Sequence, residues 1–572
     1  MRFVLVFALI LAGCTQPGPN TDEAGNPFTD LTNEYFQAMF ENSPTAATAA
    51  GLHTYDSKLD DLSAKSVANR IVKLKAFQSR LAAIKTQTAD DAVDAEFLAS
   101  RITAELFDLE TLQTWKKNPM HYIELAGSAV DGLMKREFAP SKERLQLVTA
   151  RLKQLPSAYE AMQANVSNPP KEFTDLAIRM AKGTVDFLQK DVPAWAAEAA
   201  AGDAVALAEF KKADDSALEA LKAASTWLSG DLKASSKGEY AIGSEAFAKK
   251  LLYEEMVDIP LNKLLAIGEA NLEKDYRKFL DVAGRIESKK SPAQVMASLS
   301  EEHPSAERLI PATKQSLAGI RKFLVDRKIL NLPNEQMPIV RETPPFARNG
   351  SFASMDSPGV LESKANEAFY YVTPPEKDWD AKHVEEHLRL FNKPVMDVIT
   401  IHEVFPGHFT QFLFSKQYPT KVRQLLFVSS NAEGWAHYAE QMMIEEGYGL
   451  NDPKLALAQL SEALLRDCRY IAGIKLHTEG WTVEQATRLF MEKGFQERAN
   501  AFEEARRGTY NPTYLYYTLG KLQIYKLRED YRQAKGIEYS LINFHDAFIK
   551  VGPMPLKLVR KILLPMDKNP TL

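Results

Sequence analysis

The stretch ITIHEVFPGHFTQ, residues 399–411, places two histidines, a glutamate and a Pro-Gly pair in one short segment. Around an unbroken helix, the six-residue step from His402 to His408 would separate the two side chains by roughly 120°. Pro406 has no N–H to donate to the carbonyl of His402, and Gly407 accepts backbone angles that other residues avoid. We therefore predict a break at Pro406-Gly407 that turns His408 back toward His402.

A second segment, NAEGWAHYAE at residues 431–440, follows after a spacer long enough for a turn and another helix. The familiar zinc motif H-E-x-x-H sets its histidines four positions apart, whereas here the spacing is six. Catalytic zinc usually takes three protein ligands and keeps one position for water. We predict that His402, His408 and Glu433 bind one Zn²⁺ per chain, and that Glu403 acts as the general base.

Other interpretations of these residues stay open. His402 is also compatible with a buried histidine whose nitrogens are both bonded, and Glu433 with an ion-pairing or helix-capping carboxylate; their clustering favours the metal. His437 shares the helical face of Glu433, so it is a rival ligand, a supporting group or a packed histidine. A His/His/Glu donor set also suits manganese, cobalt or nickel.

The same motifs carry a family resemblance. His402-Glu403 with Pro406-Gly407-His408, followed by EGWA at residues 433–436, resembles the bacterial family DUF885. That family is similar in logic to the gluzincin metallopeptidases of the thimet oligopeptidase and carboxypeptidase Taq groups. The resemblance implies zinc on His402, His408 and Glu433 with Glu403 as the base, and it leaves the substrate unassigned.

Further residues are expected at the site through the resemblance alone. His477, before a Gly-Trp pair, is expected to contact substrate or the oxyanion, although a structural role is equally compatible. Arg507 and Tyr510 lie where similar peptidases carry substrate-binding groups. Tyr517 is the preferred candidate for the hydroxyl that hydrogen-bonds the oxyanion.

One short segment reads as a strand in an otherwise helical chain. Phe369, Tyr370 and Tyr371 belong to the run FYYVT, whose aromatic and β-branched residues favour a strand. We predict an edge strand that pairs with an extended peptide substrate beside the active-site cleft. Apolar residues elsewhere recur three and four positions apart, so we expect a mostly α-helical fold with a small β element. The family resemblance implies that this helical fold is metallopeptidase-like.

The composition is that of a folded protein, with 45% hydrophobic and 25% charged residues in a chain of 572. This length exceeds one typical core, so we predict a helical N-terminal subdomain at 28–236 and a catalytic subdomain at 237–572. Net charge is −5 without a basic stripe, which argues against a nucleic-acid partner. Two cysteines exclude a disulfide framework. Nothing in the sequence indicates the oligomeric state.

The N-terminus, MRFVLVFALILAGC, has one positive charge before an apolar run that is too short to span a bilayer. We assign residues 1–13 to a signal peptide. Its end, LAGC, resembles the lipobox of bacterial lipoproteins, which implies a diacylglycerol on Cys14 and a membrane anchor; a plain secretory signal is the alternative. Residues 14–27 form the expected tether. Thr15 stands where Asp would favour the inner membrane, so the resemblance indicates the outer membrane, facing the periplasm.

Together these features predict a zinc-dependent peptidase anchored in the cell envelope. One rival is an amidase that uses the same metal on a non-peptide or cell-wall amide. The other is a lipoprotein that binds peptides or envelope partners without catalysis. Substrate profiles distinguish the first rival, and metal content combined with a Glu403→Gln variant distinguishes the second.

Overall fold

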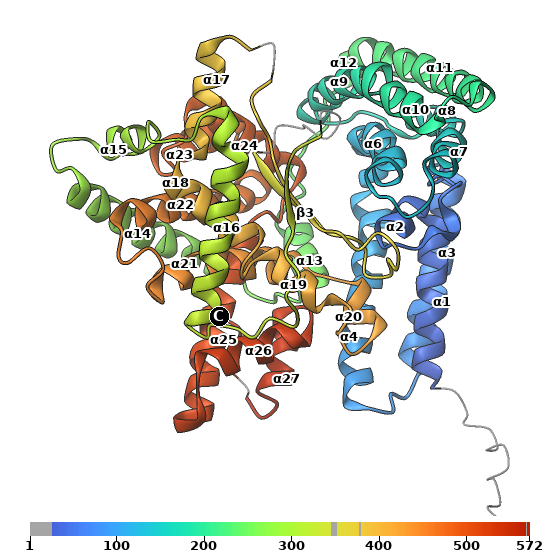
Figure 1. The fold of residues 1–572 in the computed structure, drawn as a ribbon. Helices are drawn as coiled ribbons and strands as arrows, with labels where there is room; N and C mark the ends of the chain where they lie inside the picture. The colour runs from blue at the N-terminus through green and yellow to red at the C-terminus, as the bar shows by residue number, and fades with distance from the viewer. Residues whose placement is uncertain (1–25, 345–351, 377–378, 568) are drawn as a thin grey trace, which may run out of the picture.

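The computed structural model describes residues 26–344, 352–376, 379–567 and 569–572 (Figure 1). The predicted signal peptide, Cys14 and nearly all of the tether lie outside these residues. The described chain is mostly α-helical with one three-stranded sheet, which confirms the predicted fold class. Within the described residues, no helix is both long and apolar enough to cross a membrane.

The chain begins with helices that run side by side at one edge of the molecule (Figure 1). They are α1 (Pro27–Asn42), α2 (Pro44–Ala49), η1 (His53–Tyr55), α3 (Ala64–Ala83), α4 (Ala89–Phe107), η2 (Asp108–Leu112) and α5 (Thr114–Lys117). The next group, residues 120–235, is called the helical lobe below. It contains α6 (Met120–Lys135), α7 (Ser141–Leu152), α8 (Leu155–Asn165), α9 (Lys171–Asp186), η3 (Phe187–Asp191), α10 (Val192–Ala200), α11 (Ala204–Trp227), η4 (Leu228–Leu232) and α12 (Lys233–Ser235).

The remaining elements surround the sheet. Before and within it come α13 (Ser244–Glu255), α14 (Leu261–Ile286), α15 (Pro292–Leu299), η5 (Ala306–Arg308), α16 (Leu309–Asp326), β1 (Ile339–Glu342), β2 (Ala353–Asp356) and β3 (Phe369–Val372). After it come α17 (Ala381–Leu388), η7 (Arg389–Phe391), α18 (Lys393–Glu403), α19 (His408–Ser415), α20 (Lys421–Leu425), α21 (Ser429–Glu445), α22 (Pro453–Thr478), α23 (Val483–Glu492), α24 (Arg498–Tyr510), α25 (Tyr516–Lys535), η8 (Gly536–Glu538), α26 (Leu541–Val551) and α27 (Leu556–Leu563).

The sheet corrects one prediction about substrate binding. Its order is β1-β3-β2, with β1 parallel and β2 antiparallel to β3. All four residues of β3 are buried. Phe369, Tyr370 and Tyr371 therefore form the central strand, and the predicted edge strand was wrong. The physical reason is that the apolar run FYYV is typical of a strand covered on both faces but does not show which strands flank it, and those strands come from other segments of the chain.

Two large cores divide the described residues. The helical lobe packs around an apolar cluster made mostly of its own residues, from Met120 to Leu232, which Leu59 and Ala365 join from outside the lobe. Helices α1, α3 and α4 instead share a core with α18–α21 and α25–α27. Ion pairs reinforce this contact. The buried Arg423 donates to the buried Asp94 at 2.7 Å and to the exposed Asp90 at 2.6 Å. Helices α1, α3 and α4 thus pack with the C-terminal helices, whereas the segment from Pro44 to Leu62 also contacts the lobe, where Arg151 donates to the carbonyls of Pro44 and Lys58. The division at residue 236 stays a prediction.

Candidate metal and active site

The predicted break in the helix is present. Helix α18 ends at Glu403 and α19 begins at His408. Because Pro406 lacks an N–H, the chain uses other bonds: Gly407 N donates to the carbonyl of Ile401 at 3.0 Å. A Cβ on Gly407 would lie 1.7 Å from the His402 carbonyl oxygen, so only glycine fits here.

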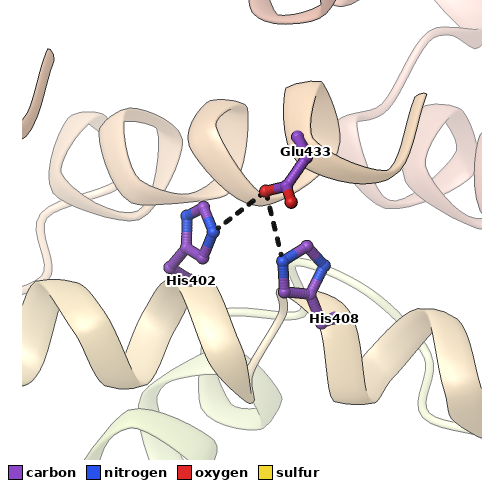
Figure 2. Close-up of side chains that lie close together, drawn as sticks. All are labelled: His402, His408 and Glu433. Carbon is purple, nitrogen blue, oxygen red and sulfur yellow. Dashed lines mark ion pairs between the residues drawn. The ribbon is translucent and has the colours of Figure 1, made fainter. Parts of the chain in front are cut away.

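The break brings three side chains together. His402 and His408 lie with ring centroids 4.8 Å apart and planes at 89°. From the facing helix α21, Glu433 places Oε2 3.4 Å from Nε2 of each histidine (Figure 2). A tetrahedral zinc with bonds of about 2.0–2.1 Å separates its ligand atoms by roughly 3.4 Å. Candidate ligand atoms of the three residues all lie within 4.8 Å of one another, so the set fits one metal ion.

Helix α21 is locked onto this break by Trp435. Its indole N–H donates to the carbonyl of Pro406 at 2.7 Å, and the side chain is fully buried. Trp435 lies two residues after Glu433 on the same helix. The bond therefore holds Glu433 in register with the turn that carries His408.

Glu440, which was not predicted as a site residue, fixes the orientation of His402. One carboxylate oxygen lies 2.7 Å from His402 Nδ1 and 3.2 Å from Arg466 Nη2. The carboxylate can only accept, so the Nδ1–H points to Glu440 and Nε2 faces Glu433 and His408. Without a metal this Nε2 keeps a proton that Glu433 accepts, and a bound metal ion would replace that proton. Glu440 follows Glu433 by seven residues, two turns on the same helical face, and this spacing is the signal that was available.

His437 is not part of the candidate ligand set. Its Nδ1 lies 3.1 Å from the second oxygen of Glu440, so it supports that carboxylate from behind. Burial, with a smaller effect from Lys521, lowers the pKa of His437 to about 3 and keeps the ring neutral. Of the three interpretations left open, the geometry corresponds to a buried supporting group.

The three candidate ligands compensate one another's charge. Burial opposes ionisation of Glu433, but hydrogen bonds from His402 and His408 hold its pKa well below the usual value. Burial likewise opposes a charged His402, yet Glu433 and Glu440 outweigh it and raise its pKa to about 10. A carboxylate held ionised between two imidazoles matches the charge that a divalent cation requires.

Glu403, the predicted base, is the last residue of α18. It lines a cavity that His402, His408 and Glu433 also line. Its Oε2 accepts the backbone N–H of Met355 in β2 at 3.2 Å. The edge strand beside the candidate metal site is therefore β2. This bond holds the carboxylate beside the histidine pair.

The cavity has a volume of about 420 Å³. It is lined by Ser354, Met355, Val398, Ile399, His402, Glu403, His408, Glu433, Glu440, Glu462, Arg466, Arg469, Arg507 and Tyr517. Tyr517 and Arg507, both expected through the family resemblance, are thus in the cavity. The guanidinium groups of Arg466 and Arg469 lie 5.5 and 5.1 Å from the centroid of the Tyr517 ring, which holds the phenol in place.

Other predicted residues lie elsewhere. His477 is buried at the end of α22, where its Nε2 bonds the carbonyl of Gly508 at 2.7 Å and burial lowers its pKa to about 4. Tyr510 is 38% exposed and packs edge-on against Phe173. Both line a separate cavity of about 780 Å³. His477 therefore has the structural role that was left open.

The aromatic strand supports the site from beneath. Tyr370 is buried, and its hydroxyl lies 3.1 Å from Thr400 Oγ1 on α18. Phe369 and Tyr371 are also buried and stack at 5.6 Å. None of the three lines the cavity that holds the histidine pair. Through Tyr370, β3 contacts α18, which presents His402, and β3 pairs directly with β2, which presents Met355.

Comparisons with known proteins agree on the fold and give no activity. The solved structure of a candidate lipoprotein of unknown function from Shewanella oneidensis matches with a TM-score of 0.79 and 26% identity, covering 94% of this chain and 99% of that one. A candidate lipoprotein from Colwellia psychrerythraea matches with a TM-score of 0.78 and 18% identity, covering 94% and 98%. No curated protein matches the chain.

The sequence also matches one family over most of its length. The match covers residues 44–563, and the family is described as "Bacterial protein of unknown function (DUF885)". These residues include the broken helix, Glu433 and the cavity arginines. The chain therefore belongs to the DUF885 family.

Proposed function

We propose that this chain is a zinc-dependent peptidase held in the cell envelope by a lipid on Cys14. The observation that carries the proposal is the convergence of His402, His408 and Glu433, with Oε2 of Glu433 3.4 Å from both histidine nitrogens. Bound there, zinc would supply Lewis acidity for a carbonyl group and would lower the pKa of a water molecule.

The chain's own groups have distinct tasks in this proposal. Glu403 accepts the proton from the attacking water and returns it to the leaving amine. Tyr517 accepts a long hydrogen bond from Arg507 at 3.4 Å, so its own O–H can be donated to the developing oxyanion. The outer side of β2, where the Met355 N–H points toward Glu403, is the edge along which an extended peptide would lie.

Hydrolysis of a peptide library tests the activity. We expect the zinc-loaded mature chain to cleave peptides and Glu403→Gln to reduce kcat by about 10²- to 10⁴-fold while keeping its metal. Glu445→Gln on α21 is a matched control, because Glu445 is outside the cavity and accepts bonds from Gln441 and Tyr525. Cleavage of non-peptide amides alone would replace peptidase with amidase. Loaded protein that cleaves neither would contradict both.

The anchor is a separate part of the proposal. It rests on the LAGC sequence at residues 11–14 and on the lipoprotein descriptions of the two structural neighbours. Thr15 in place of Asp favours the outer membrane, with the domain facing the periplasm. We expect Cys14→Ser to move the protein from the membrane fraction to the soluble fraction. An unchanged membrane fraction, with no acyl mass on the parent's N-terminal peptide, would contradict the anchor.

A further inference from the structure

Arg507 is the one cavity arginine that has no carboxylate of its own. Arg466 pairs with Glu440 at 3.2 Å and with Glu462 at 2.7 Å. Arg469 forms a two-pronged pair with Glu504, both contacts at 2.7 Å. Within the ranges that the structure describes, Arg507 forms no ion pair, and its side-chain bond is to the Tyr517 hydroxyl at 3.4 Å.

The cavity's carboxylates are already engaged. Glu433 faces the two histidines, and Glu440 and Glu462 face Arg466. Glu403 is held by the backbone N–H of Met355. Arg507 is thus a partly buried cation in a cavity whose fixed anions are committed to other partners. Removing a charge from water without a partner is costly, so a site of this kind gains free energy when a ligand brings an anion.

We propose that Arg507 binds a carboxylate of the substrate, an inference that rests on the proposed peptidase function. A guanidinium presents a planar fork of N–H donors that matches a carboxylate in two-point contact. In a peptide, that carboxylate is either the free C-terminal group or an acidic side chain. The cavity's 420 Å³ is within the range of small-ligand pockets, about 300–1,000 Å³, so a short peptide end fits between Arg507 and the histidine pair.

Tyr517 connects this carboxylate site with the chemistry. Its hydroxyl is the acceptor of the Arg507 bond, and its ring lies against Arg466 and Arg469. A substrate carboxylate on Arg507 would therefore lie beside the group proposed to stabilise the oxyanion. Binding of a peptide end at Arg507 then places a nearby peptide bond, rather than one far along the chain, against Glu403.

The carboxylate site can be tested independently of peptidase activity by measuring peptide binding to a variant that does not hydrolyse the peptide. Calorimetry with the zinc-loaded Glu403→Gln chain uses three forms of one short N-acetylated peptide: the free acid, the neutral C-terminal amide, and an amide with one glutamate. We expect at least one carboxylate form to bind about 10- to 100-fold more tightly than the neutral amide. Tighter binding of the free acid alone would show that the site recognises the C-terminal carboxylate. Tighter binding of the glutamate peptide alone would show that it recognises an acidic side chain.

Variants assign the preference to Arg507. In Arg507→Gln the preference is expected to fall to nearly 1, and in Arg507→Lys it is expected to be intermediate, because the charge remains while the fork is lost. Arg506→Gln on the same helix is the matched control, since Arg506 pairs with Glu503. In the enzyme that retains Glu403, Tyr517→Phe should slow turnover. The ratio of the affinities for the carboxylate peptide and the neutral amide should stay unchanged. Metal content of each variant reports whether the site has folded.

Two results would overturn the inference. One is equal binding of the neutral amide and both carboxylate forms by the Glu403→Gln chain. The other is a preference that survives in Arg507→Gln. Absence of hydrolysis by the parent enzyme, together with an Arg507-dependent preference, would instead remove the peptidase proposal and keep the carboxylate site.

Discussion

The helical lobe and the helices around the candidate metal site bury polar groups in different ways. In the lobe, Arg151 is fully buried and lies 3.9 Å from Asp56, but its hydrogen bonds go to neutral acceptors: the Thr48 hydroxyl and the carbonyls of Lys58, Ala129 and Pro44. Around the site, buried charges face one another: Glu440 meets His402 and Arg466. The first arrangement stabilises a scaffold, whereas the second holds side chains ready for a ligand.

Unsatisfied atoms sharpen the contrast. Close to Glu440, the buried His437 Nε2 and Arg466 Nε have no hydrogen-bond partner within the described residues. Arg144 in the lobe, by comparison, donates to the carbonyls of Ala139, Leu133 and Met134. The contrast concerns these side chains and not the two regions as wholes, because Tyr159 OH and Asp214 Oδ1 in the lobe are also buried without a partner among the described residues. Buried polar atoms without partners reduce stability, so the two beside Glu440 are a local cost of the arrangement around His402.

The largest expected effect comes from a single methyl group. Gly407→Ala should lower zinc affinity by more than about 100-fold, because its Cβ would overlap the His402 carbonyl and move His408 away from Glu433. Gly183→Ala in α9 of the lobe is the matched control, since no atom lies within 4 Å of the added Cβ; it should stabilise the chain by about 0.5–1 kcal/mol. Zinc titration and thermal unfolding measure both. Normal affinity in Gly407→Ala would refute the role of the break.

The lobe should respond in stability alone. Arg151→Leu leaves three carbonyls and the Thr48 hydroxyl without their donor, so we expect a loss of about 3 kcal/mol in unfolding free energy. Metal content should remain that of the parent. Denaturant unfolding with parallel metal analysis checks both, and loss of metal from a folded Arg151→Leu chain would show that the two regions are coupled.

Glu255 contributes a pH dependence. Burial raises its pKa to about 7 although it accepts from Ser430 at the start of α21. The folded chain thus binds a proton that the unfolded chain releases between about pH 4.5 and 7, and stability falls as pH rises through this window. Glu255→Gln should match the parent below pH 4.5 and exceed it by up to about 3 kcal/mol above pH 7. A difference in unfolding free energy between the two chains that stays the same at every pH would contradict this.

A smaller effect is expected from Glu440→Gln. The amide keeps the shape but weakens the bond that orients His402, so zinc affinity should fall by about 10- to 100-fold. Competition with a chelator of known affinity measures the change. Glu445→Gln, at the C-terminal end of α21, is the control and should not alter zinc affinity. Equal affinity in Glu440→Gln and the parent would show that the carboxylate has no orienting role.

Local chemistry was enough to predict the centre of the site. Pro406 and Gly407 encode the break because one lacks a donor and the other lacks a Cβ, and Glu433 was found because a third ligand was needed. Glu440 was missed although its seven-residue step from Glu433 was visible. Long-range pairing was harder: the neighbours of β3 come from distant segments, so its central place could not be read from FYYVT alone.

The arginines illustrate the same limit. Arg466, Arg469 and Arg507 are all basic residues on helical segments, and only the structure shows that the first two meet carboxylates while Arg507 meets the Tyr517 hydroxyl. His477 likewise has the composition of a site residue, but its backbone partner, the carbonyl of Gly508, lies 31 positions away. Partners of this kind are set by helix packing and not by local spacing.

Metal content of the purified soluble chain, from Thr15 onward, tests the central claim most directly. His402→Ala and Glu433→Ala are measured beside it, with the folded state of each followed by circular dichroism. We predict about one zinc per parent chain and loss of the zinc from both folded variants. A parent that takes up no metal when zinc is supplied, or variants that retain it fully, would contradict the account.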